Sequence, residues 1–192
     1  FLNMYMPRNL KHIREYQVKI ENEIKYMLDT LVGFLSDEND RVKLEYDFDS
    51  LDKLIDSAIS KSYIDKDNIL SYDLKYFINY MEMRKSQIMT LRYIFEQGKG
   101  MKTRPSQARD LAELIFNLVP KLHESYNAVN ALMDLYFVKE KMKNSELPKS
   151  REEFEDRAIL HSMVVNFEQF LEIKREFAAN LSEEEKNIFW NR

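Results

Sequence analysis

Apolar residues recur at steps of three and four positions along most of the chain, which is the spacing of one face of an α-helix. In residues 8–36 this pattern is continuous, and the charged stretch 37–40 ends it. At about 1.5 Å per residue, such a helix would be roughly 40 Å long. The same spacing predicts further helices after Asp47 or Asp49, at 71–97, from near Pro105, at 126–143, from 151 and, as a short final turn, from 183.

Local signals indicate where several of these helices begin and end. Gly98 and Gly100 stop the helix at 71–97. Pro120 kinks or ends the next helix, because proline removes a backbone donor and clashes with the preceding turn. Ser150 and Ser182 each stand three residues before a glutamate, which is the order of a capping box, so we expect a helix to start after each of them.

Each predicted helix carries a stripe of residues that we expect to face inward. In chain order, the stripes are Ile13, Tyr16, Ile20, Ile24, Met27, Leu31 and Phe34 or Leu35; Phe48, Leu51, Ile55, Ala58 and Ile59; Phe77, Met81, Arg84, Ile88, Leu91 and Phe95; Ala108, Leu111, Ile115, Leu118 and Leu122; Val129, Leu132, Met133 and Tyr136; and Leu160, Met163, Val164, Phe167, Phe170, Leu171 and Phe177. The last stripe is wide, as suits a helix that contacts several neighbours.

Helix breakers are scarce, with 3 Gly and 4 Pro in 192 residues. The stretch 41–48 alternates apolar and polar residues, but one isolated strand has nothing to pair with, so we expect a loop laid on the bundle. The sequence therefore predicts an all-α protein, an antiparallel bundle of about five to six helices with a four-helix-bundle-like core. We expect residues 9–192 to form one domain.

Composition removes several classes of function. The chain has no cysteine, which excludes disulfides, thiolate metal sites and cysteine nucleophiles. A net charge of −4 argues against a nucleic-acid partner, since such proteins carry a basic face. No run approaches the ~20 apolar residues of a membrane-spanning helix. We therefore expect the chain as given to be a soluble fragment of a longer protein that begins, without Met, at Phe1.

Catalytic, metal and cofactor sites are not predicted. The histidines are His12, His123 and His161, and none belongs to the Glu-x-x-His pair of a two-metal carboxylate bundle. Nothing resembles a nucleophile elbow. Residues 98–103 do not have the order of a phosphate-binding loop, and no strand precedes them, so we interpret them as a solvated basic turn. We expect no enzyme activity and no cofactor.

Arg84 stands in register with five apolar positions, so its guanidinium should lie partly inside the bundle. A buried arginine needs a carboxylate partner, or it costs several kcal/mol. We expect that partner on the helix that starts at 151, which carries these candidate polar residues near its inner face: Glu153, Arg157, His161, Glu168 and Glu172. A structural ion-pair network is the preferred interpretation, and a pocket for an anion such as a carboxylate is the alternative.

The N-terminus has an apolar stub with aromatic residues, residues 1–7, followed by basic residues. This order is typical of the cytoplasmic end of a transmembrane helix. An ordinary terminus with a basic first turn explains it equally well. The first interpretation makes residues 1–8 the junction after a missing transmembrane region.

Two motifs resemble those of a known family. The segment 146–158, ELPKSREEFEDRA, and its continuation 170–177, FLEIKREF, are similar to the C-terminal signature of the aromatic acid exporter family of Gram-positive bacteria. The segment 80–87, YMEMRKSQ, resembles that family's other recurrent motif, and 4–8, MYMPR, resembles the junction after its last membrane helix. The weakest match is 37–67.

The resemblance implies a cytoplasmic C-terminal domain of an exporter, attached to its own transmembrane domain at the cytoplasmic face of the membrane. It implies no catalytic or binding residues. The first hypothesis for function is an accessory domain for assembly or regulation, with homo-oligomerisation as one expectation. The second is a sensor that binds an aromatic acid or another anion near Arg84 and gates transport. The third is a free-standing helical adaptor that binds a partner protein.

Overall fold

The computed structural model describes residues 8–37, 42–64 and 71–191, all of whose regular elements are helical. The predicted membrane junction therefore lies outside the described residues, except for Arg8. The helices are α1 (Arg8–Ser36), α2 (Phe48–Ile64), α3 (Ser71–Gly98), α4 (Ala108–Leu118), the 3-10 turn η2 (Val119–Lys121), α5 (Val129–Lys143), α6 (Arg151–Asn180) and α7 (Glu183–Phe189). The prediction of an all-α bundle is confirmed.

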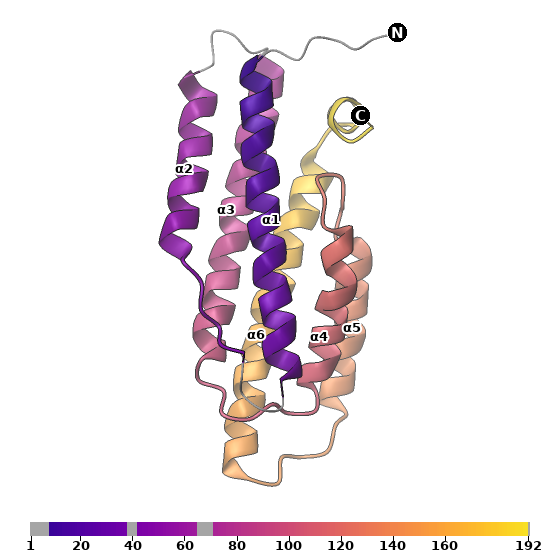
Figure 1. The fold of residues 1–192 in the computed structure, drawn as a ribbon. Helices are drawn as coiled ribbons and strands as arrows, with labels where there is room; N and C mark the ends of the chain where they lie inside the picture. The colour runs from indigo at the N-terminus through magenta and orange to yellow at the C-terminus, as the bar shows by residue number, and fades with distance from the viewer. Residues whose placement is uncertain (1–7, 38–41, 65–70, 192) are drawn as a thin grey trace.

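Successive helices from α1 to α6 run in opposite directions, and α7 lies at the end of the bundle where α6 finishes (Figure 1). Helix α3 packs against α6 and α1 packs against α4, which gives a four-helix core. Helix α2 covers α1 and α3 on one side, and α5 covers α4 and α6 on the other. The sequence predicted a four-helix-bundle-like core, and the structure identifies α1, α3, α4 and α6 as the helices that form it.

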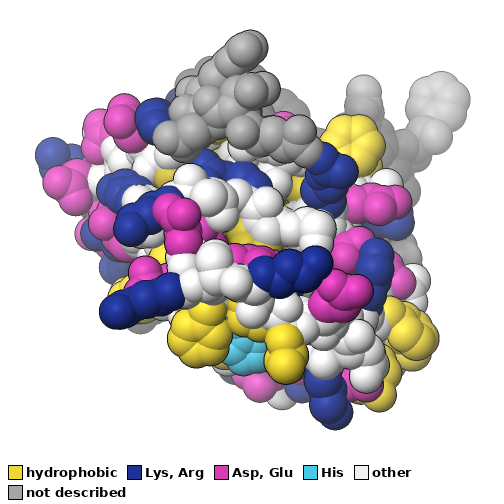
Figure 2. All heavy atoms as spheres, turned by 90° about the horizontal axis from the view of Figure 1, so that it is seen from below, with side chains coloured by type: hydrophobic (Ala, Val, Ile, Leu, Met, Phe, Trp, Pro, Cys, Tyr) yellow, Lys and Arg dark blue, Asp and Glu magenta, His cyan; other side chains and the backbone are white. Residues whose placement is uncertain are grey.

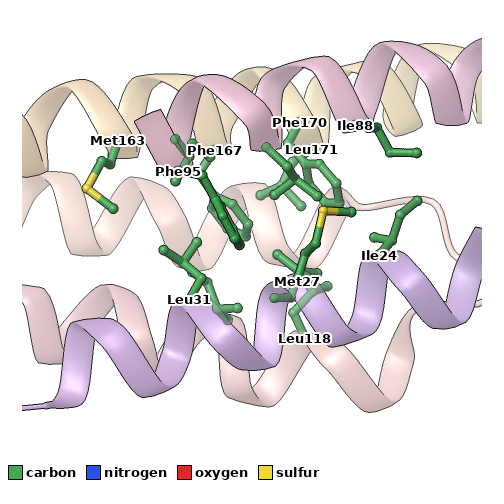
Figure 3. Close-up of a cluster of buried hydrophobic side chains, with 14 of the residues drawn as sticks. Ile24, Met27, Leu31, Ile88, Phe95, Leu118, Met163, Phe167, Phe170 and Leu171 are labelled. Carbon is green, nitrogen blue, oxygen red and sulfur yellow. The ribbon is translucent and has the colours of Figure 1, made fainter. Parts of the chain in front are cut away.

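The buried apolar side chains form two clusters, a large one along most of the bundle and a small one that includes Phe189 of α7. The small cluster consists of Ile13, Leu74, Tyr76, Phe77, Leu181 and Phe189. The large cluster is the main core. Side chains from α1, α3, α4 and α6 meet in it, among them Met27, Phe95, Leu118 and Phe167, all at most 2% exposed (Figure 3). The predicted stripes of α1, α3, α4 and α6 are confirmed, with Tyr16 and Phe177 partly buried at the ends. At about 25 cal/mol per Å² of apolar surface, this burial is the main stabilisation of the fold.

Helix α5 differs from the prediction in its start and in its orientation. It begins at Val129, not near Tyr126, because Ala128 has a left-handed φ of 64° that precedes the first turn. Its predicted inward stripe is wrong: Val129, Met133 and Tyr136 are 48%, 60% and 59% exposed, and Leu132 is only partly buried. The buried residues of α5 are Ala131 and Leu135.

The ends of the core helices are held by caps and loops. The Ser150 hydroxyl accepts a hydrogen bond from the backbone N–H of Glu153, and Ser182 and Glu185 form a complete capping box, so both predicted starts are confirmed. The predicted loop before α2 does lie on the bundle, with Leu44 2% exposed. A Cβ at Gly98 would lie 2.4 Å from the Leu44 side chain, so a larger residue at this position would force Leu44 to shift.

Candidate functional site

Arg84 of α3 is the centre of a buried polar cluster, as its register predicted. It is 1% exposed. Its Nη2 donates to Glu21 Oε1 of α1 at 3.0 Å, its Nε donates to the Tyr80 hydroxyl at 2.9 Å, and its Nη1 donates to Gln87 Oε1 at 2.8 Å. The Tyr80 hydroxyl also donates to Glu21. The expectation that the carboxylate partner would come from α6 is wrong, because α1 supplies it.

Helix α6 instead brings a second cation to this cluster, Lys174. This side chain is 1% exposed, and its Nζ donates to the Glu124 backbone carbonyl at 2.6 Å. The ammonium lies 5.1 to 5.7 Å from the ring centroids of Tyr80, Phe177 and Trp190. The sequence analysis missed Lys174, although it stands three residues after Leu171 and four before Ala178, in the same buried stripe.

Glu124 connects the cluster to two more elements. Its carboxylate accepts from Arg14 Nη1 of α1 at 3.0 Å and from the Tyr76 hydroxyl of α3 at 2.8 Å. The Tyr76 ring stacks on Phe189 of α7 with centroids 3.7 Å apart. The polar cluster thus joins α1, α3, α6, α7 and the segment between η2 and α5. Its hydrogen bonds fix the positions of these elements relative to one another.

Burial acts differently on the two cations of the cluster. For Arg84, burial opposes the charge, but Tyr80 and Glu21 outweigh it, so the pKa of Arg84 is raised. For Lys174, burial and the nearby Arg84 together hold its pKa well below the ordinary lysine value, and Glu21 and Glu124 only partly oppose them. Burial also raises the pKa of Tyr80. All three guanidinium nitrogens of Arg84 donate to protein atoms, as expected for a structural ion-pair network.

The other candidate residues on α6 lie elsewhere. Gln87 Nε2 donates to the Phe170 carbonyl at 2.8 Å, which places Arg84 beside the second half of α6. Residues 153 to 161 are some 9 to 17 positions away from Phe170, or roughly 14 to 26 Å along the helix. The structure therefore does not bring Arg84 together with Glu153, Arg157 and His161 in one site.

Glu153 and Arg157 form an ion pair in the first turns of α6, with Arg157 Nη2 donating to Glu153 Oε1 at 2.6 Å. Arg157 Nη1 also donates to the Glu146 carbonyl and to the Ser145 hydroxyl, so it ties the loop before α6 to the helix. The Lys149 backbone N–H, together with Arg157, lowers the pKa of Glu153. Glu168 binds a different partner, Lys139 of α5, at 2.7 Å.

Arg157 and His161 line a cavity between α5, α6 and the loop that joins them. Its volume is about 390 Å³, within the usual range for small-molecule sites. Its lining is Gln107, Lys139, Glu140, Met142, Lys143, Ser145, Arg157 and His161. It lies toward the end of the bundle drawn in Figure 2, where basic and acidic side chains are interspersed around a few hydrophobic ones.

Asp156 is a buried carboxylate that the sequence analysis did not single out. It is 1% exposed and accepts hydrogen bonds from the backbone N–H of Lys102 and Thr103, both at 2.8 Å, and from the Thr103 hydroxyl at 2.6 Å. In the basic loop after Gly100, the N–H groups of Lys102 and Thr103 therefore point at a carboxylate of the same chain.

The described residues contain no group of three or more His, Asp or Glu side chains placed to hold a metal ion. Within the same residues, no helix combines the length and the apolar character needed to cross a membrane. The polar groups found are ion pairs, capping groups and anchors of loops. What this arrangement can do chemically is hold helices in register and, at the cavity beside Arg157, bind a small ligand.

Comparison with known proteins shows which family the chain resembles. The family model described as "Putative aromatic acid exporter C-terminal domain" matches residues 11–175, which include the 80–87 motif and nearly all of the 146–177 motif. The chain is 28% identical over 178 residues to the uncharacterized protein YqjA of Bacillus subtilis, covering 92% of this chain and 54% of that protein. It is also similar to a crystal structure titled as a putative membrane protein of Clostridium difficile 630, with a TM-score of 0.73, 30% identity, and coverage of 88% of this chain and 99% of the other.

Proposed function

Because this chain belongs to the family of aromatic acid exporter C-terminal domains, we propose that it is the accessory domain of a membrane exporter of aromatic carboxylic acids. In this role it lies at the cytoplasmic face and serves assembly or regulation of the membrane part. The observation that carries the proposal is the family match, which extends over both recurrent motifs and over nearly all of α1 to α6.

The fraction of the relative that this chain covers supports separate roles for the two parts of the full-length protein. The chain spans about half of YqjA, 54% of its length. The described helices include no candidate membrane span. Transport itself would then belong to the other half of the full protein, and this domain would act on it through contact.

The exposed apolar face of α5 is the surface that we assign to this contact. Met133 and Phe137 are 60% and 63% exposed, one helical turn apart, and Val129 and Tyr136 extend the same face. Monomeric proteins rarely expose several large apolar side chains on one helix face without a partner. The partner to which we commit is the membrane half of the same protein, since about half of the relative's length lies outside this chain.

The test is efflux of a labelled aromatic acid from cells that express the full-length protein. Removing the domain should abolish or strongly reduce efflux, and Met133→Glu with Phe137→Glu should do the same. Met89→Glu is a matched control, because Met89 is 54% exposed on α3. Efflux that is unchanged without the domain would contradict the proposal.

Separate expression of the two halves distinguishes assembly from other roles. We expect the domain to co-purify with the membrane half and to lose it in the double Glu variant. If the domain associates only with a second copy of itself, the α5 face is a homo-oligomer interface and does not contact the membrane half. A full-length gene without hydrophobic spans would favour the free-standing adaptor instead.

A further inference from the structure

We propose that the cavity between α5 and α6 is a binding site for a small aromatic carboxylate. The lining of the cavity indicates an anion with an apolar part. That this anion is an aromatic carboxylate rests on the proposed function. The site extends the proposed role, since a ligand bound here would contact α5, the helix that carries the exposed apolar face assigned to the membrane half.

The charges of the lining favour an anion. Three basic side chains, Lys139, Lys143 and Arg157, face the cavity together with one carboxylate, Glu140. The carboxylate partners of Lys139 and Arg157, Glu168 and Glu153, are not part of the lining. Lys143 is 75% exposed, and its contact to Glu140 is long, at 3.8 Å, so its ammonium can turn toward a bound carboxylate.

Arg157 provides a fixed cation at the inner wall. Its guanidinium is held by Glu153, by the Glu146 carbonyl and by Ser145, so little side-chain entropy is lost when a ligand binds.

The remaining lining suits the apolar part of such a ligand. Met142 contributes a flexible thioether side chain, which packs well against aromatic rings. The aliphatic stems of Lys139, Lys143 and Arg157 add apolar surface below their charged ends. Gln107, which is 7% exposed before α4, offers an amide for a ring substituent. The cavity volume of about 390 Å³ accommodates a benzoate-sized molecule with substituents.

The experiment is isothermal titration of this 192-residue chain with benzoate, benzamide, acetate and inorganic phosphate. Benzamide keeps the ring without the charge, and acetate and phosphate keep the charge without the ring. We expect benzoate to bind with a Kd of about 1 mM or tighter and each of the others at least about tenfold more weakly. Equal binding of benzamide, equal binding of acetate or phosphate, or no binding of benzoate would each overturn the proposal.

Charge reversal at one lysine places the ligand in this cavity. Lys143→Glu should weaken benzoate binding by about tenfold, which corresponds to ~1.4 kcal/mol. Lys149→Glu is the matched control, because Lys149 is 83% exposed on the neighbouring loop and does not line the cavity. Equal affinities in both variants would place any bound benzoate elsewhere. Both side chains are exposed, so folding should be unaffected, and circular dichroism checks this.

The outcome is independent of the exporter role. If benzoate fails to bind but efflux by the full-length protein still requires the domain, only the site is wrong. If benzoate binds at the cavity and efflux does not require the domain, only the proposed function is wrong.

Discussion

Helix α6 carries basic side chains in two regions. In one region they are enclosed by protein, and in the other they line a cavity. Near its second half, Lys174 meets Arg84 in a cluster where both side chains are 1% exposed. Near its first half, Arg157 is 21% exposed and lines a cavity with two lysines. Burial decides the difference, since a fully enclosed charge must find all its partners within the chain, whereas a charge at a cavity wall can still accept a ligand.

A polar residue within an apolar stripe therefore indicates that its side chain is buried, but it does not indicate that the side chain binds a ligand. Arg84 was the most conspicuous candidate from the sequence, and the structure assigns it Glu21, Tyr80 and Gln87 as partners. The cavity lies instead where α5 only partly covers α6. If this contrast is right, a substitution that leaves a buried charge of the closed cluster without its partner should lower stability strongly, and one at the open cavity should lower it little.

The largest effect is expected for Arg84→Ala. It leaves the Glu21 carboxylate without its partner inside the bundle and opens a void, and we expect a loss of about 3–5 kcal/mol in the free energy of unfolding. Urea denaturation measures it. Arg92→Ala on the same helix is the control, because the Arg92 ion pair with Asp52 is 37% and 41% exposed and should contribute about 1 kcal/mol or less. Equal effects of the two changes would remove the distinction between a buried and an exposed arginine.

A smaller loss, about 2 kcal/mol, is expected for Asp156→Asn. The amide cannot accept all of the hydrogen bonds that the carboxylate receives from Lys102 and Thr103, and charged acceptors bind N–H donors more strongly. Hydrogen exchange should also speed up at the Lys102 and Thr103 amides. In the control Glu155→Gln the side chain is exposed, so stability should change by no more than about 0.5 kcal/mol.

At the open cavity, Arg157→Gln should lower the free energy of unfolding by only about 1 kcal/mol. The pair with Glu153 is partly solvated, at 21% and 32% exposure, so its loss is less costly than that of a buried pair. The same denaturation series measures it. A loss as large as that of Arg84→Ala would mean that Arg157 belongs to the structural core and not to a binding site.

The smallest effect at neutral pH is expected for Lys174→Met. Methionine has a similar shape and fits among Tyr80, Phe177 and Trp190, and replacing a buried cation by an apolar residue is often neutral, so we expect a change within about 1 kcal/mol.

The pH dependence sharpens this last test. Because the folded pKa of Lys174 lies below its unfolded value of about 10.4, the unfolded chain binds more protons between the two values, and the stability of the wild-type chain rises with pH in that window. The raised pKa values of Tyr76 and Tyr80 act in the opposite sense, but only above about pH 10. Thermal melts at pH 6 to about 9.5 should show the rise in wild type and a flatter profile in Lys174→Met. Parallel profiles would mean that Lys174 remains fully charged in the fold.

The sequence by itself determined the helices and most of their buried faces. The start of α1, the end of α3 near Gly98, the end of α4 at Pro120 and the caps at Ser150 and Ser182 follow from local chemistry. The burial of Arg84 followed from its register alone, and that of Lys174 could have been found in the same way. These features depend on spacing within one segment, so they can be read without knowing the neighbours.

Only the tertiary structure decided which helices meet and which polar groups pair. Glu21 and Glu168 are both glutamates on long helices, and nothing local says that the first reaches Arg84 and the second Lys139. In α5 apolar residues occur all around the helix, so the sequence allows either of two stripes to face the core. The predicted stripe runs through Val129 and Met133, and the observed one through Ala131 and Leu135. Packing against α4 and α6 placed Ala131 and Leu135 on the inner face, and this left Val129, Met133 and Tyr136 exposed on the outside.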